Sequence, residues 1–167
     1  MTNMKQITIK VAWNNSAFEG LVSSETSYGE MKIVTKDFND IIDMGEAELK
    51  IGFDGYTEFG LELPEWYKNK EYEFVYKFQD VTAMLKAYSS YVSLAAISRE
   101  TGINSALLSH YANGLKVPRN KQQNIIVAGL HRIGALLSKC TIDDERKTQL
   151  NICLLYTSPS PRDTERS

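Results

Sequence analysis

The sequence predicts an α+β protein of 167 residues. Two observations predict this class. In residues 1–78, apolar and polar residues alternate over several short stretches, as they do in half-buried strands. From residue 79 onward, the apolar spacing changes to the 3.6-residue period of amphipathic helices. We therefore expect a small strand–strand–strand–helix–strand domain over residues 1–78, followed by an all-α domain over residues 79–140.

The predicted N-terminal domain begins with a β-hairpin. Residues 5–11 alternate after Lys5, and Asn14-Asn15-Ser16 is a turn signal. Residues 17–22 are therefore expected to form the second strand, and residues 30–35 the third.

A helix is predicted next, from about Asp37 to Lys50. Four of its apolar residues share one face: Phe38, Ile41, Ile42 and Leu49. Residues 52–60 are expected to form a loop. Leu63-Pro64-Glu65-Trp66 then leads into residues 72–78, whose alternation predicts the last strand.

The predicted C-terminal domain contains four helices joined by tight connections. Short apolar stripes indicate the first three, and Pro118 is expected to open a longer fourth helix, because proline suits the first helical turn. In chain order the stripes are Val81, Leu85 and Tyr88; Leu94 and Ile97; Leu108, Tyr111 and Leu115; and Ile126, Leu130, Ile133 and Leu137.

Residues 141–167 are expected to form a disordered tail. Residues 157–167 contain two prolines and no apolar residue, so burial could not offset the entropy lost on ordering. The run 153–163, CLLYTSPSPRD, also resembles a translated sequencing adapter. We exclude residues 153–167 from the arguments on fold and function. A genuine Ser/Pro-rich tail is the alternative.

The net charge of -2 is a cancellation between two segments of opposite sign. Residues 1–78 contain eight lysines and 14 acidic residues, a net of -6. Residues 79–140 contain seven basic residues and two acidic ones, a net of +5, and residues 141–167 add -1. Such a division favours a nucleic-acid contact in the basic segment and a different, basic partner for the acidic one. A chance difference between two small domains is the alternative.

Neither a membrane location nor catalysis finds support in the sequence. No stretch approaches ~18 consecutive apolar residues, and residues 1–10 show no secretory signal. Two cysteines cannot make a disulfide framework, so a cytoplasmic location is expected. Nucleophile motifs, phosphate loops and metal-ligand spacings are absent, so we expect no catalytic residue, no cofactor and no metal. Cys140 is expected to be buried or half-buried.

The most informative stretch runs from Leu94 to Pro118. Gly102 permits a tight turn between two short helices, and Asn104 or Ser105 can cap the second of them. The outward face of that second helix is small or polar and carries no acid, which suits insertion into an electronegative major groove. This face comprises Ser105, Ala106, Ser109, His110 and Asn113, and the cations Lys116, Arg119 and Lys121 follow it.

This stretch resembles the helix-turn-helix of lambda-repressor-like (Xre-type) DNA-binding domains. The resemblance depends on Leu94, Ile97, Gly102, Ile103, Leu108, Tyr111, Gly114 and Pro118. It implies that Asn104, Ser105, Ala106, Ser109 and His110 read base edges, and Asn113 on the same face is added to these candidates. It also implies that Lys116, Arg119 and Lys121 meet phosphates. The sequence departs from the usual family pattern at Ser98 and at Ala112-Asn113, which leaves the base preference open. The alternative is a pair of helices that pack together without binding DNA.

With the preceding domain, the chain resembles the HicB antitoxins of bacterial toxin–antitoxin pairs. The resemblance covers about residues 4–140, including the strands 7–11 and 72–78 and the acidic helix after Thr35. It implies a partial RNase H-like domain that covers a basic, RNA-cleaving HicA-like toxin, and a homodimer or higher homo-oligomer that represses its own operon. Nucleases of that fold hold metal with a carboxylate on the first strand, but residues 5–12 contain none.

Two other functions stay open at this point. An Xre-type transcriptional regulator could use the N-terminal domain to bind a small ligand or only to dimerise, with no toxin partner. A nuclease could use the same domain for Mg²⁺-dependent cleavage. A short neighbouring open reading frame that encodes a basic, histidine-containing protein would favour the antitoxin, and its absence would favour the regulator.

Overall fold

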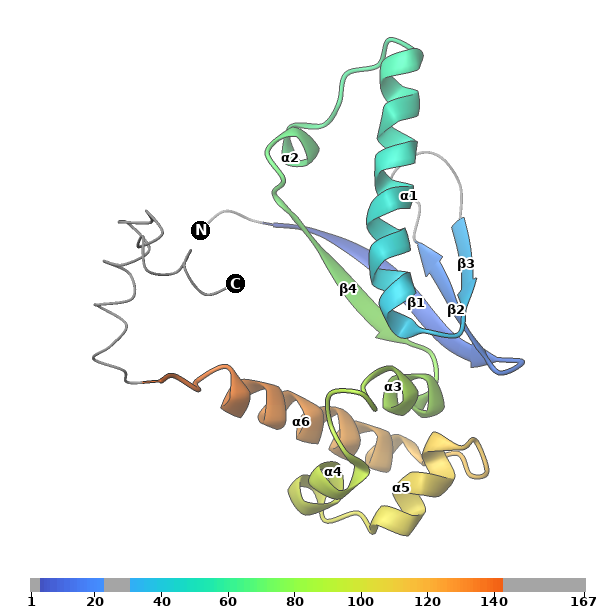
Figure 1. The fold of residues 1–167 in the computed structure, drawn as a ribbon, viewed down its shortest axis with the longest axis vertical. Helices are drawn as coiled ribbons and strands as arrows, with labels where there is room; N and C mark the ends of the chain where they lie inside the picture. The colour runs from blue at the N-terminus through green and yellow to red at the C-terminus, as the bar shows by residue number, and fades with distance from the viewer. Residues whose placement is uncertain (1–3, 23–30, 143–167) are drawn as a thin grey trace, which may run out of the picture. The chain divides into compact units, whose positions relative to one another are not determined.

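The computed structural model describes residues 4–22 and 31–142, and within them the protein is α+β with a four-stranded mixed sheet and six helices (Figure 1). The predicted order of strands is confirmed, and the short helix α2 was not predicted. The predicted tail beyond residue 142, with its run 153–163, lies outside the described residues. The elements are β1 (Lys5–Asn14), β2 (Ala17–Val22), β3 (Met31–Thr35), α1 (Phe38–Glu58), α2 (Glu65–Lys68), β4 (Tyr72–Phe78), α3 (Val81–Ala87), α4 (Leu94–Thr101), α5 (Ser105–Ala112) and α6 (Asn120–Leu137).

The described residues divide into two compact units between His131 and Arg132, so α6 begins in one unit and ends in the other. The predicted domain boundary between residues 78 and 79 stays a prediction.

The sheet has the strand order β3-β2-β1-β4. The first three strands form an antiparallel meander, and β4 pairs in parallel with β1, from Lys5 opposite Tyr72 to Val11 opposite Phe78. Asn15 and Ser16 connect β1 to β2 with positive φ angles of 48° and 61°, the conformation of a type I′ hairpin turn. This confirms the turn signal and leaves β1 as a central strand.

One face of the sheet packs against α1 (Figure 1). Alternate residues of β1, namely Ile7, Ile9 and Val11, are buried, because successive side chains of a strand point to opposite faces. On α1, the buried residues are Phe38, Ile41, Gly45, Leu49 and Phe53. Helix α3 adds Ala83 and Ala87 to the same core.

Helix α1 is longer than the sequence predicts. It was expected to end near Lys50, but it continues to Glu58, so the predicted loop is wrong for residues 52–58. The ring of Phe53 packs against the Tyr67 ring at a centroid distance of 4.1 Å and against the Trp66 ring at 5.4 Å. This aromatic packing offsets the low helix propensity of the glycines in the last turns of α1.

The helical half departs from the prediction at four points: the start of α6, Leu115, Leu137 and Cys140. Helix α6 begins at Asn120 rather than at Pro118, because Arg119 occupies the N-cap position: its carbonyl accepts from Gln122 N and its amide donates to the Gln122 side chain. Leu115 is exposed, since α5 ends at Ala112 and Gly114 turns the chain at a φ of 71°.

The end of α6 and the residues after it are also more exposed than the sequence predicts. Leu137 is exposed instead of continuing the apolar core stripe, and Cys140 is exposed rather than half-buried. The buried residues of α6 are Ile126 and Gly129, both in the part of the helix that belongs to the first compact unit.

We predict that Gly52→Ala stabilises the protein by roughly 0.5–1 kcal/mol, because alanine loses less backbone entropy in a helix interior. A Cβ at residue 52 would meet no atom within 4 Å, whereas one at Gly45 would lie 2.8 Å from Ile9 Cδ1 in the core. Gly45→Ala is therefore the matched control and should be less stable than Gly52→Ala. Urea unfolding measures both, and equal gains would contradict the packing at Gly45.

Candidate functional site

Helices α4 and α5 are joined by a turn whose hydrogen bonds are local. Ser93 caps the start of α4, and Gly102 ends the helix in the left-handed region at a φ of 73°. Thr101 Oγ1 donates to Ile97 O at 2.6 Å and accepts from Ile103 N at 3.3 Å. The predicted tight turn at Gly102 is confirmed.

Asn104 is the N-cap of α5. Its Oδ1 accepts from Ala106 N at 2.8 Å, which confirms one of the two predicted caps. The carbonyl oxygen of this side chain is thus engaged, while its amide nitrogen keeps two donors.

Tyr111 fixes α5 to its neighbours. Leu108 and Tyr111 are buried on the inward face of α5. The Tyr111 carbonyl accepts from Thr82 Oγ1 of α3 at 2.7 Å, and the Tyr111 hydroxyl donates to Gln122 Oε1 of α6 at 2.8 Å. The inward face of α5 is therefore held by both a helix before it and a helix after it.

The outward face of α5 brings the predicted base-reading residues together. Asn104, Ser105, Ala106, His110 and Asn113 are exposed, and Ser109 is half-buried. Asn113 Nδ2 donates to Ser109 Oγ at 3.4 Å, one helical turn apart. Their role in reading bases stays a prediction.

Three exposed cations lie in and after the loop that follows α5: Lys116, Arg119 and Lys121. In the part of the chain that the structure describes, none of the three pairs with a carboxylate. Their charges are therefore available to an anionic ligand on this side of the molecule.

Sequence reasoning missed two aliphatic side chains in the same loop. Leu115 and Val117 are exposed on either side of Lys116, while Pro118 is buried. The positive φ of Gly114 and the bond from Leu115 N to His110 O, at 2.9 Å, turn this loop away from the helix axis. The alternation of Leu115 and Val117 with Lys116 was the sequence signal that could have indicated these exposed side chains.

Backbone donors occupy the carboxylate of Asp80, which gives this acid a structural role at the start of the helical half. Asp80 Oδ1 accepts from Ala83 N at 2.6 Å and caps α3, and Oδ2 accepts from Trp13 N at 3.1 Å. The second bond joins the end of β1 to the start of α3. Neither the cap nor the contact with Trp13 was predicted from the sequence.

The opposite charge gathers on α1, which carries six carboxylates and one lysine. Burial raises the pKa of the Tyr76 hydroxyl, and the carboxylates of Glu46 and Asp43 raise it further. The carboxylates of α1 thus act on a hydroxyl of the neighbouring strand β4.

None of the helices in the described residues combines the length and the apolar composition needed to cross a bilayer. In residues 4–22 and 31–142, no group of three or more His, Cys, Asp or Glu side chains is placed to hold a metal ion. No protein-family model, no curated protein and no solved structure matches this chain.

We predict that Tyr111→Phe lowers the free energy of unfolding by about 1 kcal/mol, because it removes the shorter of the two hydrogen bonds to Gln122 Oε1 at a partly buried site and leaves only the 3.4 Å bond from Arg119 N. Tyr91→Phe is the matched control. The Tyr91 hydroxyl donates to Asn39 Oδ1 at 2.7 Å, but Tyr91 is 62% exposed and Tyr111 only 3%. Tyr91→Phe should lower the free energy of unfolding by no more than about 0.5 kcal/mol. Equal losses of stability in urea unfolding would contradict the role of the Tyr111 hydroxyl in fixing α5.

Proposed function

We propose that this chain is the antitoxin of a bacterial type II toxin–antitoxin system. In this proposal, α4 and α5 form a helix-turn-helix that binds operator DNA and represses the antitoxin's own operon. The acidic N-terminal part binds and neutralises a basic, HicA-like RNA-cleaving toxin.

The observation that carries the DNA-binding half of the proposal is the outward face of α5. It is small, polar and free of acid, and three unpaired cations flank it in the described residues. A helix that enters the major groove needs this chemistry, because base edges present hydrogen-bonding groups and the neighbouring phosphates repel carboxylates. Helix-turn-helix proteins commonly bind as dimers, so a homodimer on two half-sites belongs to the proposal.

The anchoring of α5 supports the same reading. Its inward face is fixed by Leu108 and by the two hydrogen bonds of Tyr111, so the outward side chains are presented from a rigid element. Sites on rigid elements hold their groups more precisely than sites on loops.

The toxin-binding half of the proposal is supported by charge and topology. The antiparallel meander, the helix α1 and the parallel β4 agree with the partial RNase H-like arrangement that the HicB resemblance implies. Strand β1, Lys5–Asn14, contains no carboxylate, so the first strand lacks the residue type with which nucleases of that fold bind metal. An acidic binding module suits a basic partner.

Co-expression with the product of the neighbouring gene tests the proposal directly. We expect the two proteins to co-purify, and we expect this chain to restore the growth of cells that the neighbour arrests. A neighbouring product that neither binds nor arrests growth would favour the regulator without a toxin partner. Robust Mg²⁺-dependent cleavage of RNA or DNA by this chain would overturn the proposal.

We predict that Ser109→Glu abolishes binding to the DNA upstream of the gene while leaving toxin binding intact, because it places a carboxylate against the groove. Ser89→Glu is the matched control: Ser89 is exposed on the turn after α3, outside α5 and the loop that follows it. Fluorescence anisotropy with a labelled operator fragment measures both variants. Unchanged operator affinity of Ser109→Glu would show that α5 does not read the DNA.

A further inference from the structure

The side of α1 that faces away from the sheet carries an exposed apolar stripe. Met44, Ala47 and Ile51 are spaced at i, i+3 and i+7, so they lie on one face of the helix. All three are exposed, and Ile51 is 60% exposed. The buried residues of α1 occupy the opposite face, so this stripe contributes nothing to the core.

Carboxylates surround this stripe. Helical spacing places Asp40 and Glu58 at its two ends and Asp43 and Asp54 along one side. An apolar centre with a charged rim is the usual composition of a protein–protein interface. From residue 40 to residue 58 the helix extends about 27 Å, comparable with the width of a standard patch of about 800 Å² per partner.

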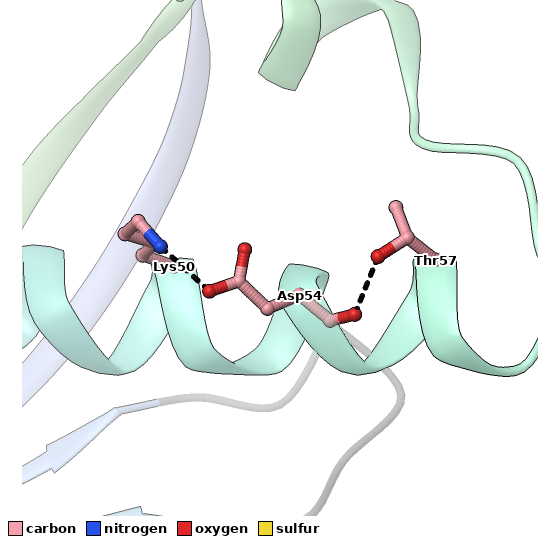
Figure 2. A network of polar contacts seen from close by, with 3 residues as sticks. All are labelled: Lys50, Asp54 and Thr57. Atoms are coloured by element: carbon pink, nitrogen blue, oxygen red, sulfur yellow. Dashed lines mark hydrogen bonds and ion pairs between the residues drawn. The ribbon is translucent and has the colours of Figure 1, made fainter.

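The single lysine of α1 does not cancel this rim. Lys50 Nζ pairs with Asp54 Oδ2 at 2.6 Å, and Thr57 Oγ1 donates to the Asp54 carbonyl at 2.7 Å (Figure 2). Within the described residues, Asp43, Glu46 and Glu58 have no cation partner. Their charges are therefore available to a partner.

Glu48 borders the other side of the stripe, one helical turn from both Met44 and Ile51. Its Oε2 is buried and has no hydrogen-bond partner within the described residues.

We propose that the stripe Met44, Ala47 and Ile51, with its acidic rim, is the surface on which the basic toxin docks. This inference rests on the proposed function and names the contact surface. Charge complementarity selects the occupant: a second copy of α1 would bring carboxylates against carboxylates, and nucleic acid or an anionic lipid surface would be repelled. A basic protein with an apolar contact patch satisfies both the stripe and its rim.

Ile51→Lys tests the inference, because it replaces an exposed apolar member of the stripe with a cation. With the full chain and the purified product of the neighbouring gene, we expect calorimetry to show binding weakened by about 30-fold or more. Val34→Lys is the matched control: Val34 is a similarly exposed aliphatic residue, at 57%, on β3. Its affinity should stay within about threefold of the unchanged protein. Thermal melts and operator binding, both expected to be unchanged, show that each variant is folded.

The outcomes separate the inference from the proposed function. If the unchanged protein does not bind the neighbouring product, the toxin-binding half of the proposed function fails, and the inference fails with it. If the unchanged protein and Ile51→Lys bind equally well, only the inference is overturned. A loss of binding confined to Val34→Lys would place the docking surface on the open face of the sheet and would also overturn it.

Discussion

The rest of the structure depends on the two hydrogen bonds that Asp80 accepts. One carboxylate oxygen accepts from the last part of β1, at Trp13 N, and the other from the first turn of α3, at Ala83 N. The chain therefore leaves the sheet and enters the helical half at a fixed point. Lys86 Nζ, 4.6 Å from the Trp13 ring centroid, adds a cation–π contact at the same place.

Helix α3 then serves two groups of neighbours. Ala83 and Ala87 complete the core beneath the sheet, and Thr82 binds the carbonyl of Tyr111 in α5. Small residues permit the close approach to the sheet, whereas the hydroxyl reaches the helix that carries the candidate DNA-reading face. A change in α3 therefore affects the acidic half and the basic half of the compact unit together.

The sequence predicted what depends on local chemistry. The alternation in β1 and β4, the turn glycine Gly102 and the cap Asn104 all act through near neighbours, and the structure confirms them. The continuation of α1 past Lys50 depends on rings far along the chain, at Trp66 and beyond, and so no local pattern contained it.

The prediction of the candidate site was also limited to what local spacing determines. The residues of the outward face of α5 followed from helical spacing. The exposure of Leu115 did not, because it depends on the backbone conformation of Gly114. The apolar stripe on α1 was also hidden, since an apolar residue in an amphipathic helix is ordinarily assigned to the core.

The parallel pairing of β1 with β4 has a consequence for folding. Each paired residue on β4 lies 67 positions after its partner on β1, as in Lys5 and Tyr72. Closing such a long loop costs chain entropy before any contact compensates for it, and non-local pairing of this kind slows folding. During synthesis, the β1–β2 hairpin and α1 leave the ribosome first. Strand β1 then lacks its second partner strand, β4, until Phe78 has emerged. The newly made chain thus displays an unpaired edge of β1 for a few seconds, at typical rates of about 5–20 residues per second, and this is the interval in which aggregation competes with folding.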